Sequence, residues 1–187
     1  MVGHKAISEN AMDSFYSRSE LRELGLRCVG DNVLISRKAS LYCTGNIEIA
    51  NNVRIDDFCL ITGGDKVVIG NYVHISAYSA VYGGGRVTFE DFTGLSPRCT
   101  VFSQSDDFSG NSLIHPFFPK SLKPGYVSRA VTLREFSQVG ANSTVLPGVE
   151  LGEGVAVGAH SLVNKSCEPW GIYAGVPVIR LKKRCHK

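Results

Sequence analysis

The sequence has little net charge and no long apolar run. Its 20 lysine and arginine residues against 17 acidic residues leave a formal charge of +3, which is too small to indicate a nucleic-acid partner. No apolar stretch reaches the roughly 18 residues of a membrane-spanning helix. The opening segment, MVGHKAISEN, lacks the apolar core of a signal peptide. We therefore expect no nucleic-acid partner and no stable membrane insertion.

The sequence also lacks the cysteine spacing of a zinc site or a disulfide scaffold. Its 6 cysteines form no Cys-x-x-Cys pair. Cys59 and Cys99 fall at positions that the repeat described below gives to small residues, so we expect both to fill the core. This cysteine usage favours a reducing compartment, and we predict a cytoplasmic location. The length of 187 residues makes one domain the default.

What the sequence does have is a six-residue period, which is clearest between residues 133 and 163. Every sixth residue there is aliphatic, and the residue four positions further on is small in most cases. The aliphatic positions are Leu133, Val139, Val145, Leu151, Val157 and Val163. Such hexads are typical of a β-helix, in which each hexad forms one short strand and one corner. Three hexads form a triangular coil, and coils must stack because one coil cannot bury its inner face alone.

The same period runs earlier, from Val29 to Val101, and predicts coils one to four over residues 29–101. Between consecutive coils the step is eight residues instead of six, and the two extra residues always follow the third strand. They lie in CTGN (43–46), TGGD (62–65) and GGGR (83–86), and each segment contains glycine, as a widened turn requires. With coils five and six over 133–163, the predicted fold class is an all-β solenoid, a parallel β-helix of about six coils.

Three segments of the single domain stand outside the period. Residues 1–28 contain a capping-box spacing at Ser17 and Glu20, so we expect a helix within residues 8–26 that covers the open end of the solenoid. Residues 102–132 have no period, and a loop of this length in a compact domain is usually functional. In the tail, residues 164–187, we expect Pro169 and Trp170 to end the repeat.

Six coils, one loop after the fourth coil and the ending VNKSCEPWGIYAGVPVIRLKKR resemble the left-handed β-helix acetyltransferases. The similarity is to sugar O- and N-acetyltransferases related to galactoside and maltose acetyltransferases, and it covers roughly residues 29–184. The segments SFYSRSELRELG and DDFSG resemble a subgroup associated with polysaccharide or lipopolysaccharide biosynthesis. The resemblance implies a left-handed coil, acetyl-CoA as cosubstrate, a saccharide acceptor, and a homotrimer with active sites between subunits.

The resemblance also implies where acetyl-CoA would lie, which is along the late coils. Its pantetheine arm would contact backbone groups at Ala141 and Ala159, where small side chains let the cofactor approach. Asn164 and Lys165 match the polar pair that the family places near the nucleotide. Family tails carry a lysine two residues after the last proline. This sequence has isoleucine there, and the cations begin at Arg180.

The catalytic base departs from the family pattern. Galactoside-type enzymes have a histidine after the third strand of the coil before the loop, and it takes the proton of the acceptor hydroxyl. The hexad alignment places Asp106 at that position, with no histidine beside it. The remaining candidates include His115 in the loop and His74 at a corner of coil three. We favour His74, because imidazole titrates near neutral pH, with Asp106 of the same or a neighbouring subunit orienting it or binding the sugar.

An amine acceptor would need less help from the protein, because a neutral amine is already a good nucleophile. Asp106 or Asp107 would then bind and deprotonate its ammonium form. We expect Asp107, Ser96 and Arg98 to bind the substrate. Aromatic residues interleave with the polar ones in the loop, from Phe102 to Tyr126, and they either pack against the coils or stack on a sugar or base.

Two other functions fit the same fold. A carbonic-anhydrase-like enzyme needs three histidines that converge on zinc, but the positions one coil away from His74 are Arg54 and Gly94, and we predict no metal site. A structural or binding solenoid would show a regular outer face. The outward positions here are irregular and charged, and the loop interrupts them. We therefore predict an acyltransferase that acetylates a saccharide or a nucleotide-linked amino sugar.

Overall fold

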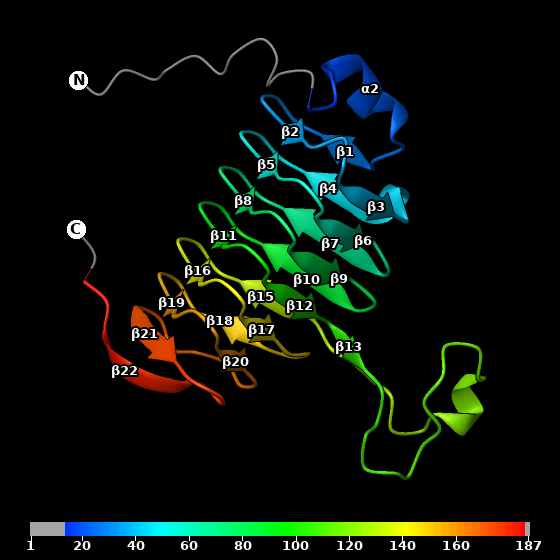
Figure 1. The fold of residues 1–187 in the computed structure, drawn as a ribbon, viewed down its shortest axis with the longest axis vertical. Coiled ribbons are helices and arrows are strands. Elements are labelled where there is room, and N and C mark those ends of the chain that lie inside the picture. Colours follow the sequence, from blue (N-terminus) through cyan, green and yellow to red (C-terminus); the bar gives the residue numbers. More distant parts are fainter. Residues whose placement is uncertain (1–13, 186–187) are drawn as a thin grey trace.

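The computed structural model describes residues 14–185, which wind as a three-sided parallel β-helix (Figure 1). Sheet 1 contains β1 (Cys28–Val29), β4 (Ile47–Ile49), β7 (Lys66–Ile69), β10 (Arg86–Phe89), β15 (Val131–Leu133) and β18 (Glu150–Leu151). Sheet 2 contains β2 (Leu34–Ile35), β5 (Arg54–Ile55), β8 (His74–Ile75), β11 (Gly94–Leu95), β16 (Gln138–Val139), β19 (Ala156–Val157), β21 (Gly171–Ala174) and β22 (Ile179–Lys183). Sheet 3 contains β3 (Ser40–Tyr42), β6 (Leu60–Thr62), β9 (Ala80–Tyr82), β12 (Thr100–Phe102), β17 (Thr144–Val145) and β20 (Leu162–Val163).

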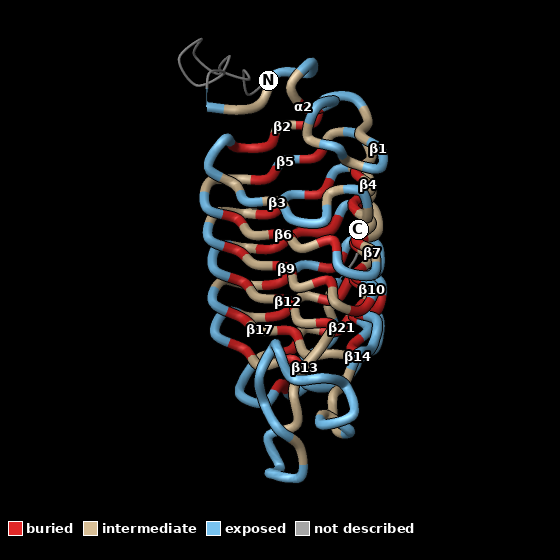
Figure 2. Tube along the Cα trace, turned by 90° about the vertical axis from the view of Figure 1, so that its right-hand side faces the viewer, coloured by how far each residue is buried: buried red, intermediate tan, exposed pale blue. Residues whose placement is uncertain are grey.

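The six-residue period sets the register of the coils. In sheet 2, Ile55 pairs with Ile75 and Leu95 pairs with Val139, so the predicted strand residues stack on one another. Every predicted strand residue from the second coil onward is buried, and the tube in Figure 2 is red along these inner strands. Val29 and Leu41 of the first coil are half-buried. The core is therefore a column of aliphatic side chains, as the sequence predicted.

The winding continues beyond the point where the period ends. Cys167 forms a parallel bridge with Leu151, and β21 pairs in parallel with β19. Strand β22 then turns back and pairs antiparallel with β21. The prediction that Pro169 and Trp170 end the pattern was wrong, because the chain adds a partial seventh turn. Its core residues, Cys167 and Tyr173, are six residues apart, but Cys167 follows Val163 by only four residues.

A short helix, α2 (Arg18–Glu23), lies over the first coil (Figure 1). Its capping box is formed by Ser17 and Glu20, as predicted. Leu21 is buried and belongs to the same core as the coils. The helix is shorter than the predicted span of residues 8–26: Phe15 forms an antiparallel bridge with Ser36, so the chain just before the helix is extended. The rest of that prediction, residues 8–13, lies outside the described residues.

The corner between sheets 3 and 1 is widened by glycine, as the eight-residue step predicted. Gly64 has a φ of +38°, and a Cβ atom built on it would lie 1.9 Å from the carbonyl oxygen of Gly83 in the next coil. Only glycine allows neighbouring coils to approach this closely. A 3₁₀ turn, η1 (Thr44–Asn46), occupies the same corner one coil earlier.

The long loop leaves the solenoid at this corner after β12 and projects away from it (Figure 1). Two short antiparallel strands, β13 (Gln104–Ser105) and β14 (Val127–Ser128), close its base. The loop contains one 3₁₀ turn, η2 (Lys120–Leu122). Across residues 14–185, none of the helices has the length and apolar character needed to cross a membrane.

Candidate functional site

Two pockets lie where the loop meets the coils. The smaller, of about 420 Å³, is walled mainly by apolar and aromatic residues, namely Tyr82, Phe102, Phe108, Tyr126, Leu146 and Pro147. The larger, of about 630 Å³, carries Lys120 and Lys123. Both volumes fall in the range of small-molecule sites. Gln104, Asp106 and Tyr126 line both pockets, so the carboxylate predicted from the hexad alignment stands between them.

Asp106 is engaged by a lysine of the same loop. Its Oδ1 atom lies 2.6 Å from Nζ of Lys123, and solvent does not reach this oxygen. The side chains of Asp106 and Lys123 are only 27% and 12% exposed. Nζ of Lys123 also lies 4.8 Å from the centre of the Tyr126 ring. The carboxylate therefore already binds one ammonium group in a partly dehydrated setting, where charge pairs are stronger than in water.

The glycine-rich corner makes room for the base of the loop. The side chain of Gln104 fills the space where a Cβ of Gly84 would stand, with its Oε1 1.5 Å from that position. The hydroxyl of Tyr126 donates to this Oε1 atom, and burial raises the pKa of Tyr126, which keeps the hydroxyl protonated as a donor. The stacked rings of Tyr82 and Phe102, 5.0 Å apart, form the adjoining wall.

Two other loop candidates have local contacts. Oδ1 of Asp107 accepts a hydrogen bond from the backbone N–H of Ser109 at 2.8 Å, and hydrogen bonds from Ser109 lower the pKa of Asp107. Nδ1 of His115 accepts from the backbone N–H of Phe117 at 3.2 Å. Neither Asp107 nor His115 lines the two pockets. In this chain both side chains stabilise turns of the loop.

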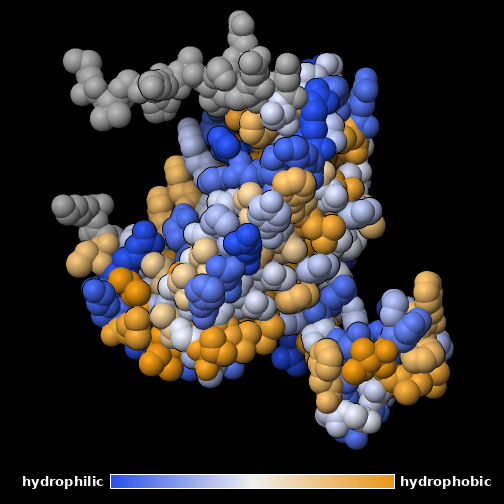
Figure 3. Space-filling model, in the orientation of Figure 1, coloured by the Kyte–Doolittle hydropathy of each residue, from blue (hydrophilic) through white to orange (hydrophobic). Residues whose placement is uncertain are grey.

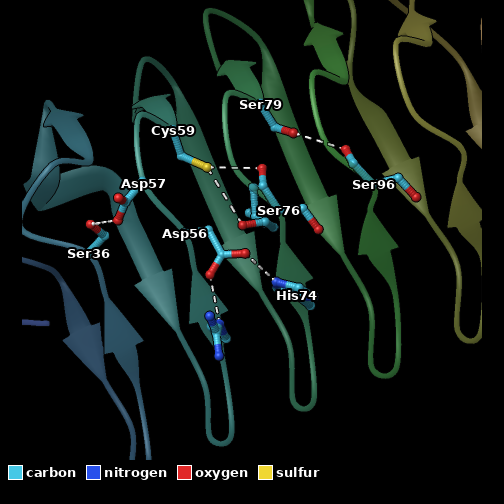
Figure 4. A network of polar contacts seen from close by, with 10 residues as sticks. Ser36, Asp56, Asp57, Cys59, His74, Ser76, Ser79 and Ser96 are labelled. Atoms are coloured by element: carbon cyan, nitrogen blue, oxygen red, sulfur yellow. Dashed lines mark hydrogen bonds and ion pairs between the residues drawn. The ribbon is translucent and has the colours of Figure 1, made fainter. Parts of the chain in front are cut away.

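His74 lies in strand β8 on the outer side of sheet 2. The prediction that it stands at a corner was wrong, although it does point outward. Its Nε2 atom lies 2.8 Å from Oδ2 of Asp56, and Nε of Arg54 lies 2.7 Å from the other oxygen of that carboxylate. Figure 4 shows Asp56 directed toward His74, with Ser96 on the neighbouring coil. The pair therefore resembles the imidazole–carboxylate arrangement of general bases.

Within one chain His74 and Asp106 do not pair. His74 contacts Asp56 from sheet 2, whereas Asp106 contacts Lys123 beyond the far edge of sheet 3. The predicted joint action of the two residues would thus need a neighbouring chain.

Four other predicted residues lie in one column at the corner between sheets 2 and 3. The residues are Ser96, Arg98, Ala141 and Ala159. The backbone N–H of Ser96 donates to Val139, and the carbonyl of Ala141 accepts from His160 at 2.8 Å. Arg98 lies over the ring of Tyr78 at 5.4 Å. The corner thus presents small residues on the late coils and a guanidinium on the fourth coil.

The glycines before the two alanines lie against the next coil. A Cβ on Gly140 would lie 2.6 Å from the backbone nitrogen of Ala159, and one on Gly158 would lie 3.0 Å from Cβ of Ala174. Close stacking of the coils therefore requires glycine at position 140 and leaves little room at position 158. Ala159 is exposed and Ala141 is half-buried.

The remaining cofactor candidates are exposed near the end of the solenoid. Asn164 and Lys165 follow β20 at the corner between sheets 3 and 1. Arg180 lies in β22, opposite Tyr173 of β21. These cations and the amide are on the C-terminal coils, but they do not share a corner with Ala141 and Ala159.

Sequence reasoning missed the residues that surround Asp106. Lys123, Gln104 and Tyr82 had no spacing that linked them to a site. Tyr126 was noticed only as one of several loop aromatics. Within residues 14–185 of one chain, no group of three histidine, cysteine or carboxylate side chains is placed to hold a metal ion.

Comparisons with known proteins agree with this architecture. No known family model matches the chain. It is 38% identical over 175 residues to a dTDP-4-amino-4,6-dideoxy-D-glucose acyltransferase of Escherichia coli, covering 93% of this chain and 91% of the relative. The N-acyltransferase AntD of Bacillus cereus, in a crystal structure with dTDP and 3-hydroxybutyryl-CoA, is 50% identical, with a TM-score of 0.89 over 92% of this chain and 90% of AntD.

A more distant structure shares the fold alone. The hexapeptide-repeat acetyltransferase VCA0836 of Vibrio cholerae, complexed with acetyl-CoA, is 13% identical, with a TM-score of 0.64 over 98% of this chain and 94% of that protein. Together, the left-handed parallel β-helix and the loop-bound pockets define a hexapeptide-repeat acyltransferase. The chain belongs to the family of sugar acyltransferases that includes the E. coli relative. The predicted family, fold and acyltransferase activity are confirmed. The predicted cosubstrate was acetyl-CoA, and the coenzyme A and 3-hydroxybutyryl-CoA bound in AntD support an acyl-CoA.

Proposed function

We propose that this enzyme transfers an acyl group from acyl-CoA to the amino group of a nucleotide-linked amino sugar. The observation that carries the proposal is Asp106, a partly buried carboxylate that binds an ammonium group between two ligand-sized pockets. AntD, at 49% identity, has been crystallised with dTDP-4-amino-4,6-dideoxyglucose and coenzyme A. An amine acceptor also explains why the loop position of the family histidine carries a carboxylate here.

The spacing of two residues supports the same site. AntD has been crystallised with substitutions at one serine and at one aspartate, ten positions apart in its numbering. In this chain the one serine followed ten residues later by an aspartate is Ser96, and the aspartate is Asp106. Both were predicted as site residues, and we propose that Asp106 binds the substrate ammonium and Ser96 the sugar beside it.

The chemical step then needs one proton acceptor and one electrophile. The ammonium of the bound sugar gives a proton to the imidazole of His74, which Asp56 orients. The neutral amine attacks the thioester carbonyl, so that a C–N bond forms. Collapse of the tetrahedral intermediate breaks the C–S bond, and the second amine proton goes to the departing CoA thiolate.

We propose that the active site lies between subunits of a homotrimer. Ser96 and His74 belong to sheet 2 and its corner with sheet 3, whereas Asp106 lies beyond the opposite edge of sheet 3. One acceptor sugar cannot touch both sets within a single chain. Pairing the corner of one chain with the loop of the next would bring them together.

The surface of the loop supports an assembly of this kind. Figure 3 shows hydrophobic atoms gathered on the projecting loop. Phe108 and Phe117 are 80% and 89% exposed, and Leu113, Ile114 and Phe118 are also exposed. Apolar clusters of this sort usually mark a surface that another chain covers. A neighbouring subunit is the proposed cover.

The cofactor would also lie at the boundary between two subunits. We propose that the pantetheine arm passes Ala141 and Ala159 of one chain, and that Asn164, Lys165 and Arg180 contact the nucleotide end. Asn164 and Lys165 extend the corner that carries the loop, so they would face the alanine column across the subunit boundary. This arrangement accounts for their separation within one chain.

Arg98 completes the proposed substrate contacts, whereas Asp107 has an indirect role. Arg98 stands next to Ser96 in the corner column, where its guanidinium could bind an anionic part of the acceptor. Asp107 would act on the substrate only through the loop turn that it stabilises.

The cellular role follows from the substrate. A nucleotide-linked sugar is an activated glycosyl donor, so its acylated product is suited to a later glycosyl transfer. This supports the predicted role in surface-polysaccharide or lipopolysaccharide biosynthesis. The predicted cytoplasmic location is supported by the cysteines, since all six are free thiols.

The decisive experiment measures free thiol released from acyl-CoA. With dTDP-4-amino-4,6-dideoxyglucose as acceptor we expect turnover, and with the analogue that carries a 4-hydroxyl we expect at least about 100-fold less. Asp106→Asn should lower kcat/KM for the amine by about 10- to 100-fold, the value of a hydrogen bond to a charged group. Asp65→Asn, an exposed carboxylate in an earlier corner, is the control. Equal rates with both acceptors would overturn the proposal.

A further inference from the structure

The ion pair between Lys123 and Asp106 occupies one oxygen of the carboxylate that would bind the substrate ammonium. Nζ of Lys123 lies 2.6 Å from Oδ1 of Asp106, and solvent does not reach this oxygen. A sugar ammonium at the other oxygen would place two cations beside a single negative charge, and the two ammonium groups would repel each other. The substrate amine therefore competes with Lys123 for Asp106.

The larger pocket gives the side chain of Lys123 room to move away from Asp106. Asp106 lines both pockets, whereas Lys123 lines only the larger one. Its other contacts are weak ones that a long side chain can exchange: the face of the Tyr126 ring at 4.8 Å and the carbonyl oxygen of His115 at 3.5 Å. A modest rotation within the larger pocket would leave Asp106 open toward the smaller pocket.

The larger pocket also has a net positive charge, which favours anions. Lys120 and Lys123 line it together, against the single carboxylate of Asp106. A diphosphate group carries enough negative charge to bind both lysines, and lysine is a common ligand of phosphate oxygens. An anion in this pocket would draw the Lys123 ammonium away from Asp106.

We propose that substrate binding exchanges ion pairs: the diphosphate of the nucleotide sugar takes Lys123, and the sugar ammonium takes Asp106. The exchange rests on the proposed function, because it needs an acceptor that carries both charges. It makes Lys123 a specificity-determining residue. A nucleotide without an amine breaks the Lys123–Asp106 pair and leaves the carboxylate without a cation, whereas an amino-sugar nucleotide replaces the lost partner.

The test compares affinities for dTDP and for dTDP-4-amino-4,6-dideoxyglucose by calorimetry. Asp106→Asn removes the pair that dTDP must break, so it should tighten dTDP binding by about 3- to 10-fold. The same change should weaken binding of the amino-sugar nucleotide by about 10-fold or more. This opposite response to one substitution is the expected result.

Two further variants isolate Lys123. In a Lys123→Met background Asp106→Asn should no longer change the affinity for dTDP, because the pair is already absent. In a Lys120→Met background it should tighten dTDP binding as it does in the native chain. If Asp106→Asn weakens dTDP binding or leaves it unchanged in the native background, the pair is structural and the exchange is overturned.

A structure of the native protein with dTDP gives the answer without a variant. Nζ of Lys123 within hydrogen-bond distance of the diphosphate supports the exchange, and Nζ still on Asp106 overturns it. Failure of the proposed function has a different signature: the native enzyme would neither bind nor acylate the amino-sugar nucleotide. Acylation without exchange would refute only the role of Lys123.

Discussion

Ser96 and Asp106 stand on opposite sides of one strand: Ser96 precedes β12 at the corner of sheets 2 and 3, and Asp106 follows it at the base of the loop. Strand β12, with 3 residues, by itself spans about 10 Å at about 3.3 Å per residue, and the flanking residues add to this separation. If both contact one sugar, they belong to different chains.

Mixing two defective variants tests this arrangement. We expect Ser96→Ala and Asp106→Asn each to lower kcat/KM by about 10- to 100-fold. When the two chains are produced together and assemble at random, about one quarter of the sites between subunits regain both native residues. The activity of the whole co-produced pool, homotrimers included, should therefore rise to about one quarter of the native value, and that of trimers containing both variants to about one third.

The control is a mixture of the two variants that are purified separately and kept from exchanging subunits. Its activity should equal the mean of the two variants. If co-assembled trimers show only that mean, each site is formed within one chain, and the inter-subunit proposal fails.

His74 gives a second prediction. If its imidazole takes the proton of the acceptor, His74→Ala should lower kcat by about 10²- to 10⁴-fold with a smaller effect on KM. Asp56→Asn should lower kcat less, because it removes only the partner at 2.8 Å that orients the ring. The measurement is steady-state kinetics with the amino-sugar nucleotide. A His74→Ala rate within about threefold of the native rate would remove His74 from the mechanism and leave Asp106 as the acceptor.

The fold could be predicted from the sequence because the packing that stabilises it repeats every six residues. Each inward position of a coil meets the equivalent position of its neighbours, so every hexad repeats the same requirement for an aliphatic residue. The winding beyond Val163 was not predicted, because the step from Val163 to the next core residue, Cys167, is four residues instead of six. The short extended segment at Phe15 depends on a contact with Ser36 that no local pattern indicates.

Only the candidate-site residues that lie in the six-residue repeat or directly after it could be predicted from the sequence. Asp106 was found by counting hexads, and Ser96 lies in the coil just before it. Lys123 was missed because its contact with Asp106 is formed within an aperiodic loop and depends on how the loop folds back. The placing of the cofactor at Ala141 and Ala159 stays a prediction, and the glycine before Ala141 is required by the adjacent coil, whose backbone excludes a side chain there.

The cysteines allow a prediction about pH. Burial raises the pKa of Cys59 to about 11 and that of Cys167 to about 11, because a buried thiolate loses its hydration. Cys99 is shifted in the same direction by burial. Only the thiolate reacts with disulfide reagents, so these thiols should react slowly in the folded protein at pH 8.

The measurement is the time course of thiol titration with an aromatic disulfide. Three exposed cysteines, Cys28, Cys43 and Cys185, should react in a fast phase. All six should react together in guanidinium chloride. Rapid reaction of Cys59 or Cys99 without denaturant would show that the coils open locally, which the packed core does not predict.

The widened corner gives the last prediction, which concerns stability. Gly64→Ala places a methyl group 1.9 Å from the carbonyl oxygen of Gly83 at a φ of +38°. The neighbouring atom is backbone and cannot rotate away, so the coils must separate locally. We expect the free energy of unfolding to fall by about 2 kcal/mol or more, measured by urea denaturation. Gly45→Ala is the matched control, since a Cβ there would meet no atom within 4 Å. Equal losses in both variants would contradict the approach of the coils as the reason for glycine at this corner, since the lower entropy of the unfolded chain would by itself make Gly45→Ala neutral or slightly stabilising.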